Sequence, residues 1–261
     1  MTGIITATAV VAAVGLFIGI FLGLAAIQFR VEVDPKEELV LEALPGNNCG
    51  GCGFAGCSGL AAAIAKGEAR VSACPVGGAE VAGKIAEIMG VESEEMNRMT
   101  AFVMCKGTCD KTASDYVYTG VEDCKMVSFV PGGGAKSCNY GCHGYGNCVR
   151  ACSFDAIHIV DGVALVDKEA CTACGRCVEA CPKHLIELVP YTAKHLVACS
   201  SKDKGPVVMK ACQTGCIGCQ ICKKNCPSDA IEITDFLAKI DYDKCTGCGI
   251  CEEKCPKKAI V

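Results

Sequence analysis

The sequence has no tryptophan, few aromatic residues and no long run of basic residues. Aromatic residues make up 5% of the 261 positions, so a large aromatic core does not organise this chain. With a net charge of −4 and no basic stripe interleaved with aromatics, nucleic acid is not an expected partner. There is no P-loop and no G-x-G-x-x-G after a strand, so we expect no nicotinamide, flavin or nucleotide site on this chain.

What the chain has instead is cysteine. The 25 cysteines are nearly a tenth of the residues, and they fall in tight groups in which C-x-x-C recurs. This regularity indicates several small modules that are each held by a metal, and it disfavours the variable spacing of secreted disulfide proteins. Histidine is not an expected ligand, because the four histidines are scattered singly and are predicted to lie at the surface or in loops. They are His143, His158, His184 and His195.

The N-terminal segment, residues 1–29, is predicted to be a transmembrane anchor. No charged residue occurs from Ile4 to Ile27, and 24 residues at about 1.5 Å each reach about 36 Å, enough to cross a hydrocarbon core of roughly 30 Å. A cleaved signal peptide is the alternative, but the segment lacks a positive start and is long for one. Arg30 and Lys36 follow the span and no basic residue precedes it, so we expect the C-terminal bulk in the cytoplasm. The span has no ionisable group and should anchor rather than conduct ions.

After a predicted linker, 30–44, residues 45–100 are predicted to form a domain around one 4Fe-4S cluster. Its cysteines have the spacing C-x2-C-x4-C-x16-C, with a helix from Leu60 to Lys66 before the last of them. Zinc is the alternative for this motif taken alone. The segment resembles the iron-sulfur domain shared by Rnf complexes, in their B subunits, and corrinoid iron-sulfur proteins, in their large subunits. The predicted ligands are Cys49, Cys52, Cys57 and Cys74.

The C-terminal part, 196–261, carries two runs of the form C-x2-C-x2-C-x3-C-P, the pattern of bacterial two-cluster ferredoxins. In that pattern the fourth cysteine of each run ligates the other cluster. A run of three cysteines followed by Cys-Pro suits a single tetrahedral zinc ion poorly. The predicted sets are Cys216, Cys219, Cys222 and Cys255 for one 4Fe-4S cluster, and Cys245, Cys248, Cys251 and Cys226 for the other.

A shift of 74 positions maps an earlier segment, 135–195, onto this module, so the chain is predicted to carry the module twice. Alternating segments at 156–159, 163–166, 230–233 and 238–240 predict one hairpin in each copy, and hence an α+β fold. The first copy has Tyr145 where Cys219 is expected and Ser153 at Pro227, and Cys138 is the expected replacement ligand. The predicted sets are Cys138, Cys142, Cys148 and Cys181 for one 4Fe-4S cluster, and Cys171, Cys174, Cys177 and Cys152 for the other.

Five cysteines remain outside these five clusters, several of them in the connecting segment 101–134. A sixth cluster drawn from them is one hypothesis, and free buried thiols are the alternative. Cys105 and Cys199 are expected at equivalent strand ends, and the shift of 74 maps Cys138 onto Cys212. The five are Cys105, Cys109, Cys124, Cys199 and Cys212.

The order of a membrane helix, the Cys49 to Cys74 motif and ferredoxin motifs resembles the B subunits of Rnf ion-translocating ferredoxin:NAD oxidoreductases. The resemblance implies a translocase subunit that relays electrons between soluble ferredoxin and sister subunits, which would hold the flavins and the NAD site and move Na⁺ or H⁺. A polyferredoxin relay for a membrane hydrogenase or another reductase is the alternative. Lysines beside the last ligands would suit an acidic ferredoxin, or are ordinary solvated side chains. They are Lys223, Lys224, Lys254, Lys257 and Lys258.

Overall fold

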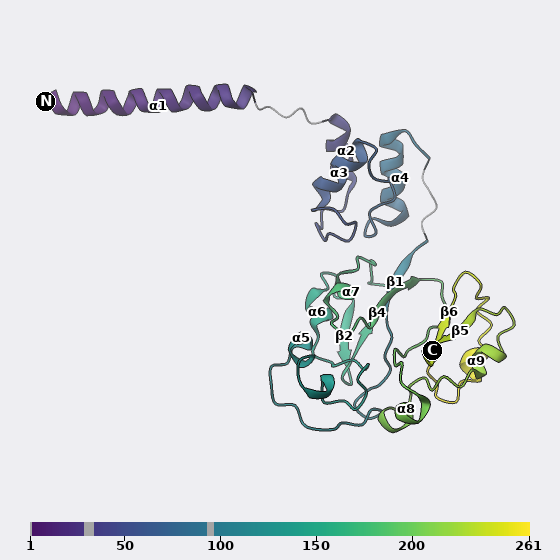
Figure 1. Ribbon diagram of the computed structural model, residues 1–261. Coiled ribbons are helices and arrows are strands. Elements are labelled where there is room, and N and C mark those ends of the chain that lie inside the picture. Colours follow the sequence, from purple (N-terminus) through teal and green to yellow (C-terminus); the bar gives the residue numbers. More distant parts are fainter. Residues whose placement is uncertain (1, 29–33, 93–96) are drawn as a thin grey trace.

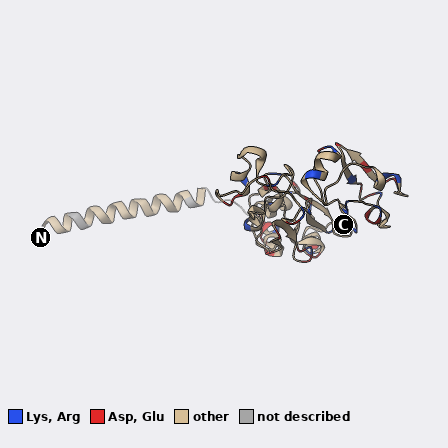
Figure 2. Cartoon of the chain, turned by 90° about the horizontal axis from the view of Figure 1, so that it is seen from below, with Lys and Arg blue, Asp and Glu red and all other residues tan. Residues whose placement is uncertain are grey.

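A computed structural model describes residues 2–28, 34–92 and 97–261. Helix α1, Thr2–Gln28, lies apart from the folded part of the chain (Figure 1). The stretch Thr2–Ala25 is long and apolar enough to cross a membrane. The helix carries no charged side chain (Figure 2), and large apolar side chains such as Phe17 are exposed along it. An apolar helix without a protein partner is stable where lipid covers it, which is what the predicted anchor requires.

A small helical domain follows, built from α2 (Pro35–Ala43), α3 (Cys57–Ala65) and α4 (Gly78–Met89). Its core contains Val40, Leu60, Ile64 and Ile85. The Asp34 side chain accepts a hydrogen bond from the Lys36 amide and caps α2, with Pro35 as its first residue. The predicted linker 30–44 therefore needs a correction for its described residues, because α2 buries Val40 completely. The predicted helix from Leu60 to Lys66 corresponds to α3.

The first cysteine module contains two small antiparallel sheets. Strand β1 (Met99–Val103) pairs with β4 (Ile186–Pro190), and β2 (Ile157–Val160) forms a hairpin with β3 (Val163–Val166), close to the predicted limits. Buried residues of these strands, among them Ile157 and Ile186, pack together with cysteines. The short helices around them are α5 (Cys124–Val127), a 3-10 turn at Pro131–Gly133, α6 (Asn147–Ala151) and α7 (Arg176–Ala180).

The second module repeats this plan (Figure 1). Strands β5 (Ile231–Thr234) and β6 (Leu237–Ile240) form the hairpin that the sequence predicts. Val197 pairs with Ile260 by a single bridge, the counterpart of the β1 to β4 pair between Val103 and Ile186. Its helices are α8 (Gly205–Ala211), α9 (Ile221–Lys224) and α10 (Ile250–Glu253).

The first module begins earlier than the predicted residue 135, because β1 belongs to its β1 to β4 sheet. Cys105 and Cys199 follow equivalent strands, and Cys138 and Cys212 are the next equivalent pair. The distance along the chain is 33 positions from Cys105 to Cys138 and 13 positions from Cys199 to Cys212. The first copy therefore has 20 additional residues at this place, and α5 lies among them. The two copies are thus a common framework with one insertion.

Candidate functional site

In the helical domain the cysteine loop leads directly into α3. Cys57 is the first residue of that helix, and its amide donates a 2.8 Å hydrogen bond to Oδ1 of Asn48. Gly56 before it has a φ of 96°, which favours glycine. Burial raises the pKa of the Cys74 thiol, and the neighbouring Cys52 and Cys57 thiols raise it further. Cys52, Cys57 and Cys74 thus lie close together, with Cys49 in the same loop.

In the second module the eight regularly spaced cysteines line two cavities. Burial raises the pKa of the Cys222 thiol to about 11. The amides of Ala259 and Ala230 donate to Sγ of Cys255 and Cys226, at 3.3 and 3.4 Å. The fourth cysteine of each run lines the other run's cavity, as cross-ligation requires. The sets are Cys216, Cys219, Cys222 and Cys255, and Cys226, Cys245, Cys248 and Cys251.

In the first module one set gathers as the spacing predicts. Burial raises the pKa of the Cys177 thiol to about 11, and three neighbouring thiols add to the shift. The Ala101 amide, on β1, donates a 3.4 Å hydrogen bond to Sγ of Cys171. Strand β1 thus supports this set as well as the sheet. The neighbouring thiols are Cys171, Cys174 and Cys152.

The other set of the first module differs from the prediction in one member. Cys124 lines its cavity, and Cys138 lines a different one. Burial raises the pKa of the Cys148 thiol to about 12, and the Cys124 thiol adds to this shift. The prediction that Cys138 completes the set therefore needs a correction. The cavity is lined by Cys124, Cys142, Cys148 and Cys181.

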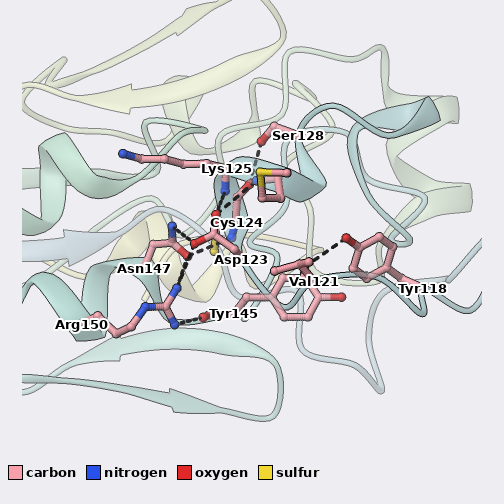
Figure 3. A network of polar contacts seen from close by, with 10 residues as sticks. Tyr118, Val121, Asp123, Cys124, Lys125, Ser128, Tyr145, Asn147 and Arg150 are labelled. Carbon is pink, nitrogen blue, oxygen red and sulfur yellow. Dashed lines mark hydrogen bonds and ion pairs between the residues drawn. The ribbon is translucent and has the colours of Figure 1, made fainter.

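A polar network holds Cys124 in place (Figure 3). Asp123 caps α5 by accepting from the amides of Lys125 and Met126, at 2.9 and 3.2 Å. The Cys124 amide donates to Oδ1 of Asn147 at 2.9 Å, and Asn147 Nδ2 donates to Asp123. Asn147 begins α6, which carries Cys148, so one side chain connects the two thiols. The insertion thus places a thiol at the cavity of the set that has Tyr145 at the position of a standard ligand.

A further cavity lies between the two modules and is lined by two cysteines from each. Two of them follow the equivalent strand ends, and the other two precede the first ligand of each copy by four positions. Burial raises the pKa of the Cys199 thiol to about 11, and that of Cys138 is also raised by burial. From the sequence, Cys105, Cys199 and Cys212 lie outside the five predicted clusters, and Cys138 is predicted to be a ligand within the first module. The four cysteines that line this cavity are Cys105, Cys138, Cys199 and Cys212.

Cys109 is the cysteine left outside these sets. It is exposed, and its amide donates to the Asp161 carbonyl at 2.9 Å. Two histidines line cysteine cavities, which the sequence did not indicate: His143 beside Cys142, and His195, whose Nδ1 lies 2.9 Å from Oε2 of Glu252.

The chemistry of these sets fits iron-sulfur clusters. Their donors are thiols alone, and backbone amides point at several of the sulfurs, as cluster sites require. In the described part of the chain, Nε2 of His143 is buried without a hydrogen-bond partner, beside the cavity of the Cys124 set. Among residues 2–28, 34–92 and 97–261, no three His, Cys, Asp or Glu side chains converge as a site for a single metal ion would.

Comparison with protein families supports the cluster chemistry. The model described as a putative Fe-S cluster matches residues 44–76. A 4Fe-4S binding domain matches residues 164–187, and a 4Fe-4S dicluster domain matches residues 215–259. The chain therefore contains 4Fe-4S domains in a mixed α+β setting.

Relatives match nearly the whole chain. The B subunit of the Na(+)-translocating ferredoxin:NAD(+) oxidoreductase complex of Acetobacterium woodii is 48% identical over 94% of this chain and 73% of its own length. The B subunit of the ion-translocating oxidoreductase complex of Methanosarcina acetivorans is 45% identical over 98% of this chain and 97% of its own. The chain belongs to the family of Rnf complex B subunits. A further Rnf relative, from the proton-translocating ferredoxin:NAD(+) oxidoreductase complex of Clostridium ljungdahlii, is 40% identical over 83% of this chain and 76% of its own length.

Proposed function

We propose that this chain is the membrane-anchored iron-sulfur relay of an Rnf-type complex, passing electrons between reduced ferredoxin and the other subunits. The names of its relatives, which are subunits of ferredoxin:NAD(+) oxidoreductase complexes that move Na⁺ or protons, support this activity. The sister subunits would hold the flavins and the NAD site. Family membership favours this function over a polyferredoxin that serves a hydrogenase.

The observation that carries the proposal is that five of the six cysteine sets, those of the two modules and the one between them, lie next to one another in an unbroken series. Within each module two sets exchange their fourth cysteine. Between the modules, the Cys142 amide donates to Sγ of Cys105 at 3.4 Å, and the Cys216 amide donates to Sγ of Cys199 at 3.2 Å. The set between the modules, which we call the seam set (Cys105, Cys138, Cys199 and Cys212), thus contacts one set on each side. We propose six 4Fe-4S clusters held by these 24 cysteines.

In such a relay the protein holds the clusters in place and shields them from water. A 4Fe-4S cluster takes up or gives away one electron with little change of structure. The buried thiols of Cys148, Cys177 and Cys222 keep water from the sulfurs. Amide hydrogen bonds to sulfur stabilise added negative charge and so raise the potential, and their number differs among the sets. No general acid, base or nucleophile is needed on this chain.

The domain arrangement follows from the same sets. We propose α1 as a single-pass anchor, the helical domain as a one-cluster unit, and the two modules as two-cluster units joined by the seam set. Arg30 and Lys36 lie directly after the apolar span, and because basic residues are enriched on the cytoplasmic side of a span, they support a cytoplasmic C-terminal bulk.

The test is anaerobic purification of the complex from membranes, with iron and flavin analysis of this subunit and an assay of ferredoxin-dependent NAD reduction. Six clusters require about 24 irons per chain, whereas a content of about 20 irons would correspond to five clusters and contradict the proposed seam cluster. Copurification with subunits that carry flavin and an NAD site is expected. Isolation with a hydrogenase, without ferredoxin-dependent NAD reduction, would overturn the proposal.

A further inference from the structure

The helical domain touches the first module at the cysteine loops of both. A Cβ atom built on Gly51 would lie 2.5 Å from the carbonyl oxygen of Cys174 and 3.1 Å from its Cα. Gly51 sits between Cys49 and Cys52, and its backbone is not in the left-handed region. Backbone conformation therefore does not require glycine here. The approach of the Cys174 backbone does, because a side chain cannot fit between them.

The two copies of the module differ in how far this loop is covered. In the first copy Ala173 is 8% exposed and, in the described part of the chain, Oγ1 of Thr172 is buried without a partner. The shift of 74 places Thr246 and Cys248 at the equivalent loop of the second copy, and both are exposed there. The ligand loop of the first copy, against which the Gly51 loop lies, is thus better screened from water than that of the second copy, where the side chains of Lys194 and His195 approach.

We infer that the 49–52 loop docks on the 171–175 loop and fixes the helical domain's cysteine set directly next to that of Cys152, Cys171, Cys174 and Cys177. Gly51 is the positioning residue of this contact. The inference rests on the proposed relay, since it supplies the one connection between neighbouring sets that neither cross-ligation nor an amide to sulfur hydrogen bond provides. It makes the first module's outer loop an internal contact of the chain.

The experiment compares Gly51→Ala with Gly83→Ala in the full-length chain, loaded with clusters, reduced and studied by electron paramagnetic resonance. Gly83 lies in α4, has no left-handed backbone and has open space around its Cβ position, so alanine is tolerated there. Magnetic coupling between the helical domain's cluster and that of the first module is expected in the unaltered chain and in Gly83→Ala. Loss of that coupling is expected in Gly51→Ala at unchanged iron content, and coupling that persists would overturn the docking.

Hydrogen exchange of the unaltered chain gives a second measurement, which decides the matter even if Gly51→Ala loses its own cluster. Amides of 172–175 are expected to exchange more slowly than their counterparts at 246–249. Equal exchange in the two loops would overturn the inference. Neither readout needs ferredoxin or NAD, so a failed docking and a failed relay function are told apart.

Discussion

Gly56 is the position at which a single methyl group should release one cluster. Its φ of 96° and ψ of 176° belong to a region that only glycine enters readily. A Cβ there would lie 2.8 Å from Oδ1 of Asn48, the atom that accepts the Cys57 amide. In Gly56→Ala the backbone must therefore move, the amide loses its partner, and Cys57 shifts away from Cys52 and Cys74.

The magnitude follows from two contributions. Backbone strain of this kind costs about 1–3 kcal/mol, and the lost hydrogen bond costs about 0.5–1.5 kcal/mol. Together they lower the free energy of local opening by about 1.5–4.5 kcal/mol, so the open fraction increases by a factor of about ten to about two thousand. The control is Gly59→Ala within α3, where the added Cβ meets only Phe54 Cβ at 3.8 Å and alanine favours the helix.

Hydrogen exchange of the α3 amides measures the opening, and iron analysis measures the cluster. We expect Gly56→Ala to exchange faster by the factor above and to lose about four irons under a chelator. Gly59→Ala should retain its iron and exchange no faster than the unaltered chain. Equal exchange and equal iron in both variants would refute the role given to Gly56 and Asn48.

Two further predictions concern the ligands and the partner. Cys124→Ala and Cys138→Ala should each remove about four irons, whereas the control Cys109→Ala should remove none. Cys138→Ala and Cys212→Ala should lose the same cluster signal, and Cys124→Ala should lose a different one. A shared signal for Cys124→Ala and Cys138→Ala would contradict the assignment. A charge-reversal variant should slow the oxidation of an acidic ferredoxin about tenfold or more at low salt and weaken the salt dependence of that rate. The lysines to be reversed are Lys223, Lys224, Lys254 and Lys258, and within the described residues none of them is in an ion pair. Reversal of Lys204 and Lys210 is the control, and equal rates in both variants would exclude docking at the first group.

Much of this arrangement could be predicted because cysteine spacing records the geometry of a cluster. The shift of 74 positions places Cys181 opposite Cys255 and Cys152 opposite Cys226, and the structure brings each beside the thiols that cross-ligation implies. Hairpins also follow from local alternation: β3 has the predicted limits, and β2 differs by one residue. Spacing is informative here because each hairpin lies on one short segment, and because the ferredoxin pattern itself assigns the fourth cysteine of each run to the other cluster.

The missing parts depend on contacts between distant segments. Spacing alone cannot show that Cys124, on an insertion, approaches Cys148, since the Asp123 and Asn147 contacts that hold it join residues more than 20 positions apart. The membership of β1 in the first module was missed for the same reason, because its partner β4 lies far along the chain. One signal was present in the sequence: Cys138 maps onto Cys212, a cysteine that the second copy does not need for its own two sets.

That equivalence accounts for the different ligand set that we propose for the first module. Each copy places one cysteine after its first strand and another four positions before its first ligand, and these four thiols line the seam cavity. If Cys138 served the first module instead, the seam set would keep three thiols and Cys124 would stay buried without a role. With Cys124 in the first module, six sets of four use 24 of the 25 cysteines, and the one left over, Cys109, is exposed. Tyr145 stands where the second copy has a ligand thiol, and Cys124 lines the cavity of that set, so the proposed assignment leaves Cys138 to join the two modules.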